Sequence, residues 1–301
     1  EKMSNWSKPL CSISENLTPY LNLGCGQRFH LDWVNIDFTE SGKGIIVHDL
    51  LQGIPYPDHS FDVVYHSHLL EHFPKSSAKP FLDECYRVLR PQGILRIAVP
   101  DLEQIARTYL LALEKAHFGV PEWIANYEWI LLEMYDQTAR NYSGGEMAAY
   151  LFSDTIPNQD FVLQRIGTEA KILIEMGRQL RQQSLSTPVA TPQPLRFLKQ
   201  IYRFLRYSAY RREATLRVLL GQEYEVLNIG RFRRSGEIHQ WMYDRFSLTS
   251  LLHQCRFQQI TQQAADTSAI PHWTNFNLDT EPDGSVYKPD SIYIEAIRPD
   301  L

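Results

Sequence analysis

Three histidines and a glutamate fall within seven positions of one short stretch, VVYHSHLLEHF, at residues 63–73. His68, Glu71 and His72 have the H-x-x-E-H spacing of a zinc site whose two histidines share a helical face. Histidine also titrates near neutral pH and is therefore a common general base. In a purely structural interpretation, Ser67 or His68 caps a helix and Glu71 lies in its first turn.

The elements around this stretch alternate between strand and helix patterns over the first hundred residues. Short apolar runs that end in turn residues predict strands at residues 20–23, 33–36, 44–48, 61–65 and 94–99. The segment PFLDECYRVL has helical apolar spacing and stops at Pro-Gln-Gly. Such alternation indicates a parallel sheet, in which ligands bind beyond the carboxyl ends of the strands.

Near the C-terminus, a helix at 247–254 and strands at 259–264 and 291–297 predict an antiparallel pair at one sheet edge. Residues 116–236 have helical spacing instead. We therefore predict an α/β fold, with a Rossmann-like, mostly parallel sheet, an antiparallel edge pair and a large helical insertion after the fifth strand. Residues 1–115 and 237–301 would form the core. Residues 116–236 would form a cap over the substrate, and Trp129 could line the pocket of that substrate.

Polar residues and glycines follow successive predicted strands. Gly24 and Gly26 follow the first strand, and a Gly-x-Gly turn lets a ligand approach the backbone. Asp37 closes the second strand, where a carboxylate can accept hydrogen bonds from both hydroxyls of a ribose. Asp49 closes the third, where it can accept from an adenine amino group. Phe29 stands where the G-x-G-x-x-G dinucleotide fingerprint needs its third glycine, which argues against NAD.

The segments LNLGCG, WVNIDF, HDLLQGIPYPDHSFDVVYHSHLLEHF and ECYRVLRPQGILRIAVPD resemble class I S-adenosylmethionine-dependent methyltransferases of the type 11 group. The resemblance covers residues 20–101 and resumes at 242–299. The segment GEIHQWMYDRFSLTSLL is similar to predicted methyltransferases of bacterial glycan and natural-product clusters. The stretch between the first two strands is short, so the family's usual first helix should shrink to a turn or two.

This resemblance implies S-adenosylmethionine as cofactor, S-adenosylhomocysteine as product, and a small molecule or glycan unit as acceptor. It also implies the cofactor's contacts. The expected contacts are Gly24, Cys25 and Gly26 at the methionine end, Asp37 with Phe38 at the ribose, Asp49 and Leu50 at the adenine, and His66 and Ser67 near the sulfonium.

Methyl transfer to a hydroxyl requires that the hydroxyl lose its proton, so we expect O-methylation with a histidine base. His68 is the first candidate because it follows the fourth strand, and His239 is the second because it opens the segment returning from the insertion. Asp101, at the end of the fifth strand, could orient the base or the substrate. No metal is expected. The alternatives are a zinc hydrolase that uses H-x-x-E-H, and a non-catalytic cofactor-binding protein whose insertion is an interaction surface.

The composition limits the function classes. Hydrophobic residues at 44% and charged residues at 22% are ordinary for a globular protein, and a net charge of −5 gives no reason to expect nucleic acid. Four scattered cysteines, no membrane-length apolar run and no signal-peptide core favour a cytoplasmic location.

A basic run extends from Arg196 to Arg217, with seven Lys or Arg residues and one acidic residue. Its simpler interpretation is a solvated helical face packed on the core. The alternative is a weak docking surface for an anionic membrane or a phosphorylated carrier.

Overall fold

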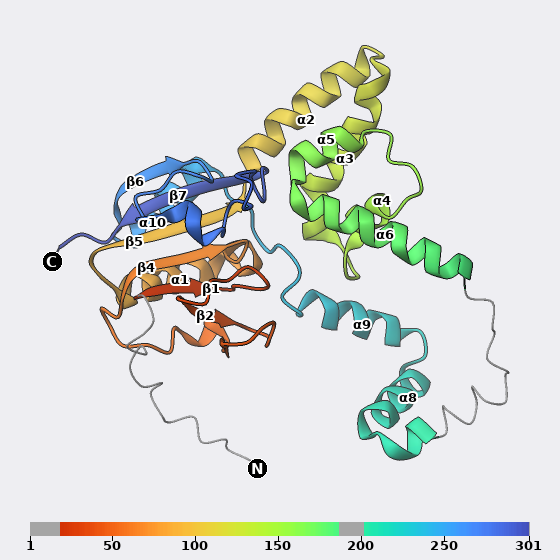
Figure 1. Ribbon diagram of the computed structural model, residues 1–301. Helices are drawn as coiled ribbons and strands as arrows, with labels where there is room; N and C mark the ends of the chain where they lie inside the picture. Colours follow the sequence, from red (N-terminus) through yellow and green to blue (C-terminus); the bar gives the residue numbers. More distant parts are fainter. Residues whose placement is uncertain (1–18, 187–201, 301) are drawn as a thin grey trace. The chain divides into compact units, whose positions relative to one another are not determined.

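The structure, a computed structural model, describes residues 19–186 and 202–300 (Figure 1). These residues form two compact units. The sheet unit comprises the described parts of Glu1–Thr138, Pro157–Lys171 and His239–Leu301, and the helical unit those of Ala139–Ile156 and Ile172–Ile238.

In the described residues, seven strands form one sheet in the order β3-β2-β1-β4-β5-β7-β6, and Figure 1 labels all of these strands except β3. The first five are parallel to one another, and β7 runs antiparallel to both β5 and β6. This arrangement confirms the predicted Rossmann-like sheet with an antiparallel edge pair. The strands are β1 (Tyr20–Leu23), β2 (Val34–Asp37), β3 (Ile45–Val47), β4 (Phe61–Ser67), β5 (Leu89–Pro100), β6 (Gln258–Gln263) and β7 (Ser291–Ile297).

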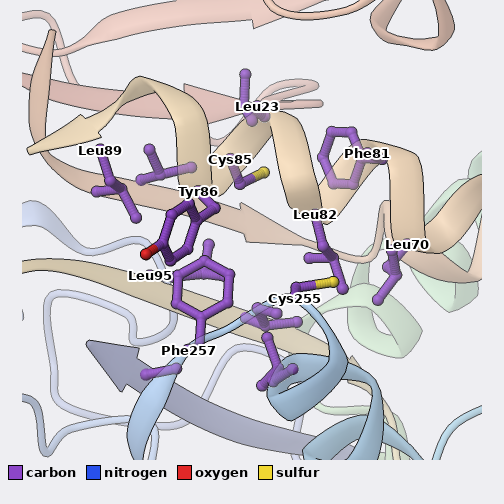
Figure 2. Close-up of a cluster of buried hydrophobic side chains, with 14 of the residues drawn as sticks. Leu23, Leu70, Phe81, Leu82, Cys85, Tyr86, Leu89, Leu95, Cys255 and Phe257 are labelled. Carbon is purple, nitrogen blue, oxygen red and sulfur yellow. The ribbon is translucent and has the colours of Figure 1, made fainter. Parts of the chain in front are cut away.

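The central strands are buried on both faces, as expected for parallel strands between two packed layers. On β4, Val64 belongs to one hydrophobic cluster, whereas Val63 and Tyr65 belong to another, because alternate side chains point to opposite faces. The first cluster also holds Leu82 of α1 (Lys75–Val88) and Leu252 of α10 (Arg245–Gln254), and Figure 2 shows part of it.

The connection from β1 to β2 differs from the prediction, because it contains turns and no helix. Two buried asparagine side chains donate hydrogen bonds to backbone carbonyl oxygens of this connection. In a helix, these oxygens would accept from backbone N–H groups instead. Asn22 Nδ2 donates to the carbonyl oxygen of Arg28, and Asn35 Nδ2 donates to those of His30 and Trp33. The loop is therefore held by side chains at both of its ends.

The helical segments also differ from the predicted division at residues 116 and 236. Nearly all of α3 (Pro121–Ala139), which falls within the predicted insertion, belongs to the sheet unit together with α2 (Leu102–His117), and Ile105, Ala112 and Ile130 of these helices share a buried cluster. That residues 116–236 cap a substrate remains a prediction. The other helical elements are η1 (Leu50–Gln52), η2 (Leu70–His72), α4 (Gly145–Leu151), α5 (Gln159–Ile166), α6 (Thr168–Ser186), α8 (Ser208–Leu220), α9 (Glu223–Arg233) and η3 (Trp273–Phe276).

Neither α8 nor α9 contains a buried residue. Residues 208–217 of the basic run lie in α8. Its first part, residues 196–201, lies outside the described residues. Among the described helices, none is both long and apolar enough to cross a membrane.

Candidate active site

The strand order reverses between β1 and β4, and ligands of open α/β sheets bind beyond the strand ends at such a point. A hollow of about 190 Å³ lies there. Its walls come from Asn22 near the end of β1 and residues 24–28 after it, from Tyr65, Ser67 and His68 at the end of β4, and from Leu278, Tyr287 and Lys288 between β6 and β7. The sheet therefore brings the predicted glycine turn and the predicted base to one cavity.

The turn after β1 is fixed to the end of β2. Gly24 N–H donates to the carbonyl oxygen of Ile36 at 2.8 Å, and Gly26 N–H donates to Asp37 Oδ2 at 2.8 Å. Both glycines have positive φ, +63° and +51°. A Cβ on Gly24 would lie 2.7 Å from Leu69 Cδ1, whereas a Cβ on Gly26 would meet no atom within 4 Å. Gly24 is therefore needed for packing, and Gly26 leaves open space beside the turn.

Alanine at these two glycines should have separable effects. Both variants carry the left-handed backbone cost of about 1–2 kcal/mol, and only Gly24→Ala adds a clash with Leu69. We expect Gly24→Ala to lower the unfolding free energy more, and Gly26→Ala to weaken S-adenosylhomocysteine binding more than its loss of stability explains. Urea unfolding and calorimetric titration of both variants measure the two effects. Equal losses of stability would contradict the assignment.

Asp37 closes β2 with both carboxylate oxygens already engaged. Oδ2 accepts from Gly26 N–H, and Oδ1 accepts from the Thr39 N–H at 2.9 Å. Oδ1 also accepts from Thr39 Oγ1 at 3.1 Å, so Oδ2 keeps the capacity for a further hydrogen bond from a ribose hydroxyl, and Oδ1 gains it when the Thr39 hydroxyl rotates away. The neighbouring Phe38 is 68% exposed, which is unusual for an aromatic side chain and leaves its ring available for stacking.

Asp49 is the N-cap of η1, and its Oδ1 accepts from the Leu51 N–H at 3.0 Å. Of the two leucines that follow, Leu50 is buried in the main core and Leu51 is 57% exposed. The Leu50 side chain points into the core, so a contact of Leu50 with the adenine, which stays a prediction, would come from its backbone. Leu51 is the apolar side chain that this segment offers to a ligand.

The end of β4 separates two neighbouring histidines. His66 is fully buried with its ring against Phe81, and burial lowers its pKa to about 4, so its ring is neutral. Its side chain does not line the hollow, contrary to the prediction, because it points to the sheet face opposite to that of Tyr65 and Ser67, whereas His68 lies beyond the strand with positive φ. Ser67 and His68 do line the hollow.

His68 has φ of +49°, a strained value for a non-glycine residue of the kind that concentrates at functional sites. Its two ring nitrogens have different neighbours. Nε2 lies 2.7 Å from Ser291 Oγ, and Nδ1 lies 3.3 Å from Glu71 Oε1. The carboxylate favours the tautomer with hydrogen on Nδ1, which leaves Nε2 able to accept a proton.

Glu71 is a fully buried carboxylate among histidines. Burial alone would raise the pKa of its carboxyl, but the neighbouring His68, His239 and His72 outweigh burial and hold this pKa well below its usual range. His239 Nε2 lies 3.9 Å from Glu71 Oε1, and burial lowers the pKa of His239 to about 3. His239 is not among the residues that line the hollow, so it lies behind the first candidate base rather than beside it.

Two other predicted residues have structural positions. Asp101 is the N-cap of α2, where its Oδ1 accepts from the Glu103 N–H at 3.0 Å, and it does not line the hollow. Burial raises the pKa of its carboxyl. Trp129 is fully buried, and its indole N–H donates to Glu133 Oε1 at 2.6 Å. The expectation that Trp129 lines an acceptor pocket is therefore wrong, because its ring belongs to the packed interior.

The H-x-x-E-H stretch does not form the helix that its zinc interpretation requires. Residues Leu70–His72 form a single 3-10 turn, and His68 lies before it in a left-handed conformation. No side chain caps this turn, so the predicted capping by Ser67 or His68 is also wrong. His68 and His72 therefore do not share one face of an α-helix.

Residues 21–97 match the family described as "Methyltransferase domain". This segment is a class I S-adenosylmethionine-dependent methyltransferase domain. It contains β1 to β4, α1 and most of β5, and therefore the glycine turn, Asp37, Asp49 and the H-x-x-E-H stretch. S-Adenosylmethionine is the cofactor of such domains.

The chain is also similar to a protein of Mycolicibacterium smegmatis named "Probable S-adenosylmethionine-dependent methyltransferase". The alignment of 98 positions is 30% identical and covers 27% of this chain and 37% of that protein.

Among solved structures, an S-adenosylmethionine-dependent methyltransferase from Archaeoglobus fulgidus aligns over 94% of this chain and 87% of its own, with 11% identity and a TM-score of 0.36. One from Mesorhizobium loti aligns over 29% and 49%, with 18% identity and a TM-score of 0.23. TM-scores this low support no conclusion about the present chain.

The residues at the carboxyl ends of the parallel strands fit S-adenosylmethionine in two respects. The space beside Gly26 is open, so a ligand can lie against the backbone of the turn. The exposed side chains of Phe38, which directly follows Asp37, and of Leu51 provide apolar surface for a purine ring.

The sequence did not indicate the third wall of the hollow. Tyr287 and Lys288 come from a stretch with only turn signals, and Arg28 comes from the short loop after β1. The guanidinium of Arg28 lies 3.7 Å from the centre of the Tyr287 ring and pairs with Glu281 at 2.5 Å. Lys288 pairs with Glu169 at 3.0 Å. These contacts hold the connection between β6 and β7 beside the cavity. No local sequence pattern indicates these contacts.

Proposed function

We propose that this chain transfers a methyl group from S-adenosylmethionine to a hydroxyl oxygen of a small-molecule or glycan acceptor, with His68 as the general base. The observation that carries the proposal is the position of His68. It lines the hollow beside the glycine turn, with one ring nitrogen toward Glu71 and the other toward a hydroxyl, that of Ser291.

The bound cofactor supplies a methyl carbon activated by a positively charged sulfur. Gly24, Cys25 and Gly26 would hold its methionine end, and Asp37 its ribose. Phe38, Asp49 and Leu51 would surround its adenine, and Ser67 would lie near the sulfonium. Leu51 replaces Leu50 in this assignment because its side chain is the exposed one.

His68 would remove the proton from the acceptor hydroxyl and then hold it. As the acceptor oxygen is methylated, Nε2 of His68 would take up that proton. Glu71 then stabilises the imidazolium through Nδ1–H, because a buried carboxylate interacts strongly with a nearby positive charge. The hydroxyl of Ser291, 2.7 Å from Nε2, supports this role because it shows that Nε2 can receive a hydroxyl group.

Two rival functions carry less support. A non-catalytic binding protein would need no histidine–carboxylate pair beside its cofactor. A hydrolase that uses H-x-x-E-H would need the helix that this stretch does not form.

The exposure of α8 supports a further contact of the basic run with an anionic membrane or a phosphorylated carrier. Arg211, Arg212, Val218 and Leu219 of α8 are all exposed to solvent, so cationic and apolar side chains are both available to such a partner.

Cofactor binding through Asp37 tests the first part of the proposal. Asp37→Ala removes charge-assisted hydrogen bonds worth about 1.5–3 kcal/mol each, so we expect affinity for S-adenosylhomocysteine to fall at least tenfold, that is, by about 1.4 kcal/mol or more. Isothermal titration calorimetry measures the change. Asp62→Ala is the matched control, because Asp62 lies near the start of β4, at the opposite edge of the sheet. Unchanged affinity in Asp37→Ala would exclude the ribose assignment.

A further inference from the structure

Glu71 and two histidines form a compact group behind the hollow. One ligand atom each of Glu71, His72 and His239 lies within 4.8 Å of the other two. Glu71 and His239 are buried and His72 is partly exposed. His239 reaches the group from a distant part of the chain, because the carbonyl oxygen of Glu71 accepts hydrogen bonds from the Gln240 and Trp241 N–H groups.

The carboxylate of Glu71 is poorly satisfied by the described residues. Its oxygens are fully buried, and neither accepts a hydrogen bond of good geometry. The nearest nitrogens, Nδ1 of His68 at 3.3 Å and Nε2 of His239 at 3.9 Å, are farther away than the 2.7–2.9 Å of a charge-assisted hydrogen bond. A buried carboxylate without close partners is costly, and such atoms in native proteins commonly contact an ion or an ordered water.

We propose that Glu71, His72 and His239 bind one divalent transition-metal ion. Two imidazoles and one carboxylate are a ligand set that zinc and iron(II) accept, with a remaining position for water. The partly exposed His72 provides the side from which the ion and its water would enter. His68, the first histidine of the H-x-x-E-H stretch, is not a ligand in this arrangement, so the site differs from the motif that the spacing suggests.

The ion would neutralise the buried carboxylate and join the turn after β4 to the segment that begins at His239. Removing it should therefore lower the thermal stability of the sheet unit. None of the three ligands lines the hollow, but Glu71 also lies beside the proposed base His68, so metal content rather than methyl transfer is the measurement that tests this site.

Elemental analysis of the full chain, purified through a tag without histidines, tests the site. We expect close to one equivalent of a single transition metal, at least tenfold less in Glu71→Gln and in His239→Ala, as ligand-shell changes weaken metal binding by roughly 10–100-fold. His253→Ala, at an exposed histidine of α10, should keep its metal.

A second measurement covers the case in which a variant does not fold. Wild-type protein stripped with a chelator should lose thermal stability, regain it with Zn²⁺, and develop visible d–d absorption with Co²⁺. Stripped wild type that binds neither ion would overturn the proposal, as would metal that persists in the folded ligand variants. Methyl transfer and cofactor affinity are measured separately, so their failure is distinguishable from failure of this site.

Discussion

His68→Asn should lower the rate of methyl transfer by about 10²–10⁴-fold while leaving S-adenosylhomocysteine affinity nearly unchanged. The variant removes the ring nitrogen that would take the proton. Asparagine is the chosen replacement because it tolerates the left-handed backbone that His68 adopts, with φ of +49°. A loss of activity can then be assigned to the missing base rather than to a rearranged turn.

The measurement is the transfer of label from radioactive S-adenosylmethionine to a panel of phenols and glycosides, with calorimetry for the cofactor. His59→Asn is the matched control. His59 is exposed, has φ of +58° and lies at the opposite end of the same strand. His59→Asn therefore makes the same substitution in a similar backbone conformation, but away from the site. Full activity in His68→Asn would rule out this histidine as the base.

Arg96→Met should lower the free energy of unfolding by about 3–5 kcal/mol, a large part of the roughly 5–15 kcal/mol that holds a typical domain folded. Arg96 is fully buried on β5 between two carboxylates. Its Nε lies 2.8 Å from Asp279 Oδ2, and its Nη1 lies 2.7 Å from Glu295 Oε1. Methionine would leave both carboxylates buried without their positive partner.

Arg96 also joins the connection between β6 and β7 to the sheet. It donates to the carbonyl oxygens of Ala264 and Thr267 and lies over the Trp273 ring. Urea unfolding monitored by circular dichroism measures the effect. Arg107→Met is the control, since Arg107 is largely exposed and its pair with Glu103 should contribute about 0–1 kcal/mol. Equal losses in the two variants would contradict the account of Arg96.

Restoring charge balance provides a second check. Adding Asp279→Asn and Glu295→Gln to Arg96→Met should recover part of the lost stability, because uncompensated buried charge causes much of the loss. A triple variant less stable than Arg96→Met would show instead that the hydrogen bonds of the carboxylates dominate.

Local sequence patterns account for the strands and for the polar residues at their ends. Apolar runs, turn residues and helical spacing depend on neighbours along the chain, so all seven strands of the described sheet could be predicted to within a few residues, apart from the early start of β5. The glycine turn and Asp37 could be predicted for the same reason, since each directly follows a strand. The tie between Gly26 and Asp37 follows from the parallel pairing of β1 with β2.

Contacts between side chains that are distant in the sequence depend on how the elements pack. Ser291 lies beside His68 although 223 positions separate them, because β7 pairs antiparallel with β5 at the same edge. His239 reaches Glu71 through backbone hydrogen bonds from a segment that returns after the helices. Local patterns also could not separate His66 from His68, or Leu50 from Leu51. The direction of a side chain at a strand end depends on the packing of the layers above it, and residue spacing alone does not encode that packing.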